Sequence, residues 1–297
     1  MITTITFHPG RQHEKPVFSI LIPSWNNLAY LKCCVDSIRK NSVHYHQIII
    51  HVNEGSDGTL DWVKSQQLDF SHSKENAGVC YGFNAPSTLV MGEYIVLSDD
   101  DFYFAPGWDI ALVEEVQKVG HHYFCISGTM IEHTLSRNSC ALAPHDFGKT
   151  VQNFDEQKFL NGFDKIPFQD WSGSNWYPLV LHRTLWNLIG GLSTEFSPGM
   201  GSDPDMMMKL WHAGVRYYKG VSRARVYHFG SRTTARIIRN NANRQFLEKW
   251  NMSISTLYKY YLKMGTPFEG PSKEPEPDQN FRMRMLRDRF KKRVGLS

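Results

Sequence analysis

Three consecutive carboxylates, Asp99, Asp100 and Asp101, are the residues of this sequence with the clearest capacity for chemistry. They directly follow residues 94–98, an apolar run typical of a buried strand. Adjacent aspartates repel each other unless a cation neutralises them, and hard divalent cations prefer carboxylate oxygen and bridge to phosphate. The pattern alone therefore fits two interpretations equally well: a metal–diphosphate site, or a solvated acidic turn after a strand.

The elements that would position these aspartates alternate between strand and helix. Apolar runs predict buried strands at residues 17–23, 47–52, 94–98 and 123–126, with a short strand at 69–72. Helical spacing predicts helices at residues 28–40 and 108–116, and a further helix capped by Thr59. This alternation is typical of an α/β fold with a doubly wound, mostly parallel sheet flanked by helices. Ligands of such folds bind beyond the carboxyl ends of the strands, where residues 23–27, 53–59, 76–78 and 99–101 would meet.

The second half of the chain has weaker patterns. Residues 132–170 show little periodicity, so we expect an irregular segment that is either functional or disordered. Asp203 and Pro204 fit the N-cap and the first position of a helix that ends before Gly214. Strands are expected at residues 177–181, 215–218 and 223–227, a short helix at 185–189, one helix at 240–263, and a stiff proline-rich linker at 265–279.

Bulk properties exclude several classes of protein. The 297 residues suffice for one large α/β domain with an appendage. A net charge of +4 argues against a broad nucleic-acid surface. The 5 cysteines form no C-x-x-C pair, which predicts free thiols in a reducing compartment. No run has the length of a signal peptide or a membrane span, so we expect a cytoplasmic protein, soluble or peripheral on the inner face of the cell membrane.

Two common nucleotide-binding motifs are missing. A dinucleotide-binding fold would place G-x-G-x-x-G after the first strand, but that position holds Pro23-Ser24-Trp25-Asn26-Asn27. A G-x-x-x-x-G-K-[ST] phosphate loop is also missing from the sequence. The strand-end loops therefore remain as the place to look for function.

Taken together, these loops resemble those of family 2 glycosyltransferases, which have the nucleotide-sugar-binding fold called GT-A. The matching features are ILIPSWN at residues 20–26, NEGSDGT at 53–59, NAG at 76–78, DDD at 99–101, GGL at 190–192, SDPD at 202–205 and VYH at 226–228. Each is weak alone, but their joint order and spacing cover about residues 17–230.

The resemblance implies a donor-binding set at the strand ends. Its members are Pro23, Trp25, Asn53, Asp57, Asn76, Gly78, Asp99 and Asp100. Asp99 would lie near the ribose, and Asp100 would support the site because alternate residues of an extended segment point in opposite directions. Asn53 stands where the family commonly has an aspartate that faces the base, which leaves the base in doubt. Trp25 could stack in the pocket or pack in the core.

The resemblance also implies a metal site and a catalytic base. Asp101 and His228 would hold Mn²⁺ or Mg²⁺, although a histidine after a strand is more often structural. Asp203 would take the proton from the acceptor hydroxyl, and Asp205 is the alternative base because Asp203 also fits a helix cap. By position, the residues of the acceptor side are Trp171, Ser172, Gly173 and Asp205.

These inferences divide the chain into a GT-A domain at residues 1–235, with a nucleotide-binding half at 17–127 and an acceptor half at 128–235. A helical region at 236–264, the linker at 265–279 and a basic tail at 280–297 follow. In the tail, Met283, Leu286, Phe290 and Val294 recur at helical spacing among arginines. Such a helix could lie on an anionic membrane, or it could be a solvated tail or a contact in a homo-oligomer.

We therefore expect a metal-dependent, inverting, hexosyltransferase-like enzyme. Its donor would be a nucleotide-diphosphate sugar, with a UDP-sugar preferred, and its acceptor a glycan or lipid-linked glycan in polysaccharide biosynthesis. Two alternatives use the same scaffold: a metal-dependent nucleotidyl- or phosphoryl-transferase, and a non-catalytic protein that binds a sugar or nucleotide. Only the glycosyltransferase needs both Asp203 and an acceptor pocket.

Overall fold

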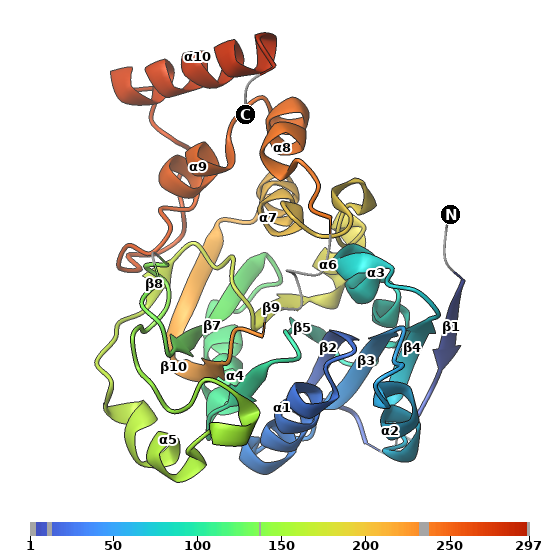
Figure 1. Cartoon of the computed structure of the whole chain (residues 1–297). Coiled ribbons are helices and arrows are strands. Elements are labelled where there is room, and N and C mark those ends of the chain that lie inside the picture. The colour runs from blue at the N-terminus through green and yellow to red at the C-terminus, as the bar shows by residue number, and fades with distance from the viewer. Residues whose placement is uncertain (1–3, 11–13, 137, 232–237, 296–297) are drawn as a thin grey trace.

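The computed structural model describes residues 4–10, 14–136, 138–231 and 238–295 (Figure 1). The strands are β1 Ile5–His8, β2 Phe18–Trp25, β3 Gln47–Asn53, β4 Asp69–Ser73, β5 Tyr94–Leu97, β6 Phe102–Phe104, β7 Phe124–Glu132, β8 Trp171–Ser172, β9 Leu179–His182 and β10 Tyr217–His228. The helices are α1 Leu28–Asn41, α2 Thr59–Ser65, α3 Gly78–Asn84, α4 Trp108–Val119, α5 Glu156–Gly162, α6 Arg183–Ile189, α7 Ser202–His212, α8 Ala242–Trp250, α9 Ile254–Thr256 and α10 Gln279–Arg293. The π-helical turn Leu257–Tyr261 continues α9.

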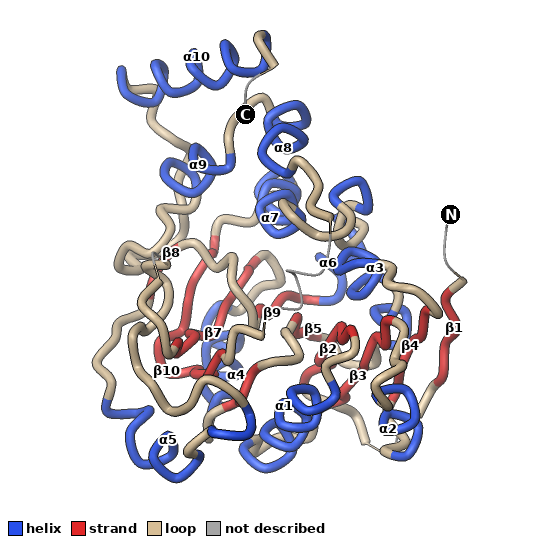
Figure 2. Tube along the Cα trace, in the orientation of Figure 1, coloured by secondary structure: helices blue, strands red, loops and turns tan. Residues whose placement is uncertain are grey.

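All the strands belong to one sheet in the order β1-β4-β3-β2-β5-β9-β7-β10-β6, with β8 paired to β10. The block β4-β3-β2-β5 is parallel, and β7 and β10 are parallel to each other, whereas β1, β6, β8 and β9 run antiparallel to their neighbours. Helices lie above and below the sheet as drawn in Figure 2. The predicted α/β class is therefore confirmed, with antiparallel strands added beside the parallel block.

The strand order reverses at β2. The chain moves from β2 to β3 and β4 in one direction, and then returns to place β5 on the other side of β2. Such a switch leaves a crevice at the carboxyl ends of the two central strands, because their following loops diverge. The loop after β5 is the one that holds the three aspartates, and β6 begins directly after them.

The predicted irregular segment at residues 132–170 is in fact packed. Its α5 helix and flanking turns bury Phe147 and Phe159 against Tyr103, Tyr227 and Phe229, in an aromatic cluster separate from the main core. Most of the segment is irregular, as predicted, but α5 and the burial of these rings were not predicted, because the burial depends on β6 and β10, which are distant in the chain. Disorder is therefore excluded for the described residues of this segment.

Two further predictions for the second half need correction, and a third is not tested. Residues 240–263 form two short helices instead of one, because Asn251 has a φ of +56° and ends α8. The proline-rich segment is not a spacer, since the backbone N–H groups of Phe268 and Ser272 donate to the carbonyl groups of Asp170 and Arg216. The boundary predicted between residues 235 and 236 lies outside the described residues.

None of the helices in the described part of the chain is both long and apolar enough to cross a bilayer. The predicted helix in the basic tail is present as α10, which Asp278 caps by accepting a hydrogen bond of 2.7 Å from the N–H of Phe281.

Candidate active site

A pocket of about 400 Å³ lies at the carboxyl ends of β2 and β5, at the switch point of the sheet. Its walls are formed by Pro23, Ser24, Trp25, Asn53, Asn76, Gly78, Val79, Asp99, Asp100, Asp101, Pro198, His228, Gly230 and Ser231. Every donor-binding and metal-binding residue predicted from the sequence is in this set, except Asp57. A larger hollow of about 510 Å³ borders the end of α1 and the start of β3, and it contains none of the predicted site residues.

Asp99, Asp101 and His228 converge within this pocket. Each offers one ligand atom, and these atoms all lie within 4.8 Å of one another. Asp101 Oδ2 lies 3.6 Å from His228 Nε2 and accepts a hydrogen bond of 2.6 Å from the backbone N–H of Ser231. Two carboxylates and one imidazole form a donor set that suits Mn²⁺, and the carboxylates alone suit Mg²⁺.

The aspartates carry an unfavourable concentration of negative charge. Burial, followed by the charge of Asp101, raises the pKa of Asp99 to about 8. The same two causes raise the pKa of Asp100 to about 7. Asp100 is buried, and its Oδ1 accepts a hydrogen bond of 2.9 Å from Asn27 Nδ2, in agreement with a supporting role. A bound cation would relieve this repulsion, which is how the residues present fit a divalent metal.

Glu132 holds the imidazole of His228 from the neighbouring strand. The two residues are paired in register between β7 and β10, and Glu132 Oε1 lies 2.9 Å from His228 Nδ1. Burial alone would lower the pKa of His228, but the charge of Asp101 and the hydrogen bond with Glu132 raise it to about 9. Because Nδ1 is directed at Glu132, Nε2 is the nitrogen that faces the aspartates and could hold a cation.

The donor side of the pocket is built on a turn at residues 76–78. Asn53 Oδ1 accepts a hydrogen bond of 2.8 Å from the N–H of Ala77, and Asn76 Oδ1 accepts one of 2.9 Å from the N–H of Gly78. Gly78 has a φ of +81°, and a Cβ atom there would lie 2.9 Å from the backbone of Pro198. With its oxygen engaged in this turn, Asn53 keeps its amide NH₂ group as the donor available to a ligand.

The two remaining predictions for the donor side have different outcomes. Trp25 is half-buried and lines the pocket, where its Nε1 donates a hydrogen bond of 2.8 Å to Glu54. Asp57 does not line the pocket. Its carboxylate instead accepts hydrogen bonds from the N–H groups of Leu28 (2.9 Å) and Thr59 (3.1 Å), at the starts of α1 and α2. Asp57 therefore performs the capping that the sequence suggested for Thr59, and the structure contradicts its prediction as a donor contact.

Asp203 lies in the first turn of α7, and it does not cap that helix. The N-cap is Gly201, whose φ is +88°, and the Asp203 side chain makes no capping hydrogen bond. Instead, Asp203 Oδ1 accepts a hydrogen bond of 2.6 Å from the hydroxyl group of Tyr177. Burial raises the pKa of Asp203 to about 6, although this hydrogen bond opposes the rise. Because the Asp203 carboxylate is not engaged in helix capping, capping is no argument against a role of Asp203 as the base.

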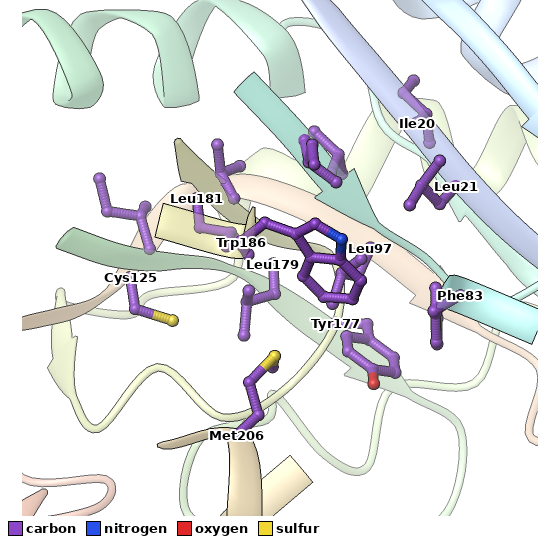
Figure 3. Close-up of a cluster of buried hydrophobic side chains, with 14 of the residues drawn as sticks. Ile20, Leu21, Phe83, Leu97, Cys125, Tyr177, Leu179, Leu181, Trp186 and Met206 are labelled. Carbon is purple, nitrogen blue, oxygen red and sulfur yellow. The ribbon is translucent and has the colours of Figure 1, made fainter. Parts of the chain in front are cut away.

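Tyr177 reaches Asp203 from the hydrophobic core. Figure 3 shows its ring among the buried side chains, near Phe83, whose ring centre lies 5.2 Å from that of Tyr177. Because the ring is buried in the core, the direction of the hydroxyl group is restricted. The charge of Asp203 contributes to the raised pKa of Asp99, after the larger effects of burial and of Asp101, so the candidate base and the metal cluster are close enough to interact.

The structure contradicts the predicted acceptor residues. Asp205 is fully buried, accepts a hydrogen bond of 2.8 Å from Trp250 Nε1 and pairs with Lys249 at 2.8 Å, so it is neither exposed to an acceptor nor available as a base. Trp171 is buried, and its Nε1 donates to Thr129 Oγ1 at 3.0 Å.

The neighbours of Trp171 are also covered. The N–H of Ser172 donates to the carbonyl of Thr266 at 2.8 Å, and a Cβ atom on Gly173 would collide with Met264. These residues support β10 and the segment at 262–267. This cover could not be predicted from the sequence, because Met264 and Thr266 follow more than ninety positions later in the chain.

Three residues that hydrogen-bond to the side chains of the predicted metal ligands or the predicted base escaped the sequence analysis. Ser231 binds Asp101 through its backbone, so its side-chain type carries no signal, although it lies close to His228. The contact of Glu132 with His228 could be predicted only from the pairing register of β7 with β10, which the sequence does not reveal. Tyr177 is the first residue of the strand predicted at 177–181, where an aromatic residue indicates packing.

Comparisons with known proteins agree with this geometry. Residues 19–174 match the family model "Glycosyl transferase family 2". Among curated proteins, the chondroitin synthase of Pasteurella multocida is 31% identical over 98 residues, which are 32% of this chain and 10% of the relative. The uncharacterized glycosyltransferase MG025 of Mycoplasma genitalium is 29% identical over 100 residues, which are 31% of this chain and 33% of the relative. The chain thus matches a third or less of the length of these relatives.

Solved structures have the same fold at low sequence identity. GalNAc-T7, solved with UDP, GalNAc and Mn²⁺, has a TM-score of 0.56 at 14% identity over 83% of this chain and 50% of its own chain. Residues 1–349 of S. aureus TarS have a TM-score of 0.52 at 14% identity over 94% of this chain and 72% of their own. Because the family model covers more than half of the sequence, the chain belongs to glycosyl transferase family 2 and is a glycosyltransferase with a GT-A fold.

Proposed function

We propose that this enzyme transfers a hexose-type sugar from a UDP-sugar to a hydroxyl group of a glycan or lipid-linked glycan, with inversion and with Mn²⁺ or Mg²⁺. The observation that carries the proposal is the proximity of two chemically different sets. Asp99, Asp101 and His228 form the cation-binding set, and Asp203, held by Tyr177, lies close enough for its charge to raise the pKa of Asp99. We assign Asp203 to the acceptor side of the site.

A cation bound by Asp99, Asp101 and His228 would neutralise charge on the diphosphate as it leaves. The residues of the chain then position the donor. The turn held by Asn53 and Gly78 provides a wall for the nucleoside, and Trp25 offers an aromatic surface in the same pocket. The free amide NH₂ group of Asn53 would donate to a carbonyl group of the base.

Asp203 would act as the general base. A pKa of about 6 leaves the carboxylate mainly ionised at neutral pH and still basic enough to accept a proton from an attacking hydroxyl group. A single carboxylate is sufficient for an inverting transfer, because the acceptor attacks the anomeric carbon from the side opposite to the leaving diphosphate. The hydrogen bond from Tyr177 would hold the carboxylate in one orientation while the proton moves.

The choice of donor and acceptor draws on the names of similar proteins. GalNAc-T7 was solved with UDP and GalNAc, which supports a UDP-sugar. The relatives include a chondroitin synthase and a hyaluronan synthase of Pasteurella multocida, which supports a polysaccharide acceptor and a role in polysaccharide biosynthesis. We place the enzyme in the cytoplasm, where nucleotide sugars would be available to it, at the inner face of the cell membrane.

The proposal is tested by incubating the protein with a panel of UDP-, GDP-, CMP- and dTDP-sugars, with Mn²⁺, with Mg²⁺ and with EDTA. We expect slow release of UDP from one UDP-sugar, dependent on the metal and lost in Asp101→Ala. Release from a different nucleotide would overturn the choice of UDP. Failure of every nucleotide to bind or react, with either metal, would contradict the enzymatic proposal. Cleavage within the diphosphate, which releases a nucleoside monophosphate and a sugar phosphate, would instead favour a nucleotidyl- or phosphoryl-transferase.

A further inference from the structure

Helix α10 is oriented in the opposite way to an ordinary surface helix. A surface helix normally turns its apolar stripe towards the core. In α10 and its C-cap, Met283, Leu286, Phe290 and Val294 are exposed to 61%, 62%, 61% and 49%. They recur every three or four residues and therefore share one face of the helix. That face, called here the outer stripe, points away from the rest of the protein.

The docked side of α10 is held mainly by polar contacts, although Met285 also packs against the core. Asp288 is 1% exposed and accepts hydrogen bonds from the hydroxyl groups of Ser253 (3.0 Å) and Thr256 (2.5 Å). Arg284 pairs with Asp288 at 3.8 Å and donates to Thr256 Oγ1 at 2.9 Å. These contacts fix the rotation of the helix about its axis, so the exposure of the outer stripe follows from specific polar bonds.

Both ends of the helix reinforce this orientation. Near the start, the ring of Phe281 lies 5.1 Å from that of Tyr260 on the docked side. Near the end, Lys292 Nζ donates to the carbonyl of Glu248 at 2.7 Å and to Asn251 Oδ1 at 2.6 Å. Rotation of the helix to bury the outer stripe would break both sets of contacts together with the buried Asp288 network.

Cationic side chains border the outer stripe on both sides. By helical position, Arg282, Arg289 and Arg293 lie along one border, and Arg287 and Lys291 lie along the other. Within the described part of the chain, these five side chains make no hydrogen bond or ion pair with a protein group. An apolar stripe with unpaired cations at its borders is the pattern of helices that lie in the interface of an anionic membrane.

We propose that the outer stripe of α10 binds the surface of a bilayer that contains anionic phospholipids. The four apolar side chains would enter the boundary between head groups and acyl chains, and the flanking guanidinium and ammonium groups would reach the lipid phosphates. Helix α8 contacts both α10 and α7, and the three helices lie together at one end of the molecule (Figure 1). Because α7 contains Asp203, the bilayer would lie at the end of the molecule that carries this helix. If the proposed function holds, the enzyme would meet a lipid-linked acceptor at this bilayer surface. Bilayer binding itself does not rest on the proposed function.

The test is co-sedimentation of the full chain with vesicles, without donor or acceptor. Vesicles of phosphatidylcholine alone are compared with vesicles containing about one third phosphatidylglycerol, at low salt and at about 0.5 M NaCl. We expect binding to the anionic vesicles about tenfold tighter than to the neutral ones, weakened by salt. Leu286→Gln with Phe290→Gln should weaken binding about tenfold, and Arg289→Gln with Arg293→Gln should remove most of the preference for anionic lipid.

Leu188→Gln is the matched control, because Leu188 is 63% exposed on α6, outside the outer stripe. It should leave vesicle binding unchanged, and thermal melts should show that all variants are folded. Equal binding to neutral and anionic vesicles, or unchanged binding of the Leu286→Gln/Phe290→Gln variant, would overturn the proposal.

Sedimentation velocity without lipid tests whether the outer stripe instead binds a second copy of the chain. A dimer that the Leu286→Gln/Phe290→Gln variant converts to a monomer, together with no vesicle binding, would assign the outer stripe to that second copy. Loss of enzymatic activity in these variants would bear on the proposed function only, because vesicle binding is measured independently.

Discussion

The hydroxyl group of Tyr177 donates a hydrogen bond of 2.6 Å to Oδ1 of Asp203, and it does so from within the hydrophobic core. Tyr177 precedes β9 and Asp203 lies in the first turn of α7, so the bond links the central sheet to the helix that carries the candidate base. A carboxylate held by a rigid donor has a defined orientation, and the second oxygen of Asp203 makes no hydrogen bond with the described residues. Both properties are useful in a general base.

Replacement of Asp203 should separate donor binding from transfer. We expect Asp203→Asn to lower kcat by a factor of about 10² to 10⁴ and to leave the affinity for UDP with Mn²⁺ unchanged, because asparagine keeps the shape but not the basicity. Asp36→Asn, at an exposed position on α1, is the control and should retain full activity. Titration calorimetry with UDP and steady-state kinetics provide the measurements, and wild-type kcat in Asp203→Asn would exclude the assignment.

The pH profile should report the same carboxylate. Because a general base works when deprotonated, we expect kcat to rise with pH through an acidic limb near pH 6, the pKa of Asp203. The hydrogen bond from Tyr177 lowers that pKa, so Tyr177→Phe should move the limb to higher pH while keeping the ring in the core. Initial rates from about pH 5 to about pH 9 with saturating donor will show the shift. Tyr45→Phe, at an exposed position, is the control and should not move the acidic limb. An acidic limb at the same pH in Tyr177→Phe would show that Tyr177 does not influence the pKa of the base.

Glu132 should influence metal binding without touching the metal. Since Glu132 orients His228 through a contact of 2.9 Å, we expect Glu132→Gln to weaken Mn²⁺ binding by about 10-fold to 100-fold. Electron paramagnetic resonance of free Mn²⁺ measures this affinity directly and needs no substrate. Glu75→Gln, an exposed change close to the same pocket, is the control. An unchanged Mn²⁺ affinity in Glu132→Gln would mean that His228 either is held by other contacts or is not a ligand.

The ionised carboxylate of Asp203 should lower the free energy of unfolding at neutral pH. Its pKa in the folded state, about 6, lies above the ordinary value of 3.8, so proton binding favours the folded state and the stability falls as the pH rises between these two values. We therefore expect Asp203→Asn to be more stable than the parent at pH 7, by about 1–2 kcal/mol after allowance for solvent screening, and equally stable near about pH 4. Chemical denaturation in EDTA at both pH values checks the sign. Lower stability of the variant at pH 7 would mean that the charged carboxylate is favoured by its surroundings.

The donor half of the site could be predicted from the sequence because its signals are local. Each loop follows a short apolar run, so the positions of Asp99, Asp101 and Asn53 at strand ends follow from the run itself. The convergence of the loops then follows from the general rule for α/β sheets. His228 was placed by its family motif, and the structure brings it to the same cluster.

The acceptor half could not be predicted in the same way. Trp171 lies under residues that follow far along the chain, and Asp205 is enclosed by Trp250 and Lys249 of α8. Burial of this kind depends on tertiary packing, which leaves no periodic signal in a single sequence. Asp57 shows a different cause of error, since a carboxylate at a strand end can cap two helices as readily as it can bind a ligand.

Strand β10 contains a bulge between Gly220 and Arg225, with its pairing to β7 regular on both sides. The regular part beyond the bulge sets His228 opposite Glu132 and also pairs with β6, the strand that begins directly after Asp101. The number of residues in the bulge therefore determines where His228 lies relative to Glu132 and Asp101. A single insertion or deletion at residues 221–224 would force one half of β10 out of step with β7, and a slip of the distal half by one residue would turn the imidazole to the opposite face of the sheet.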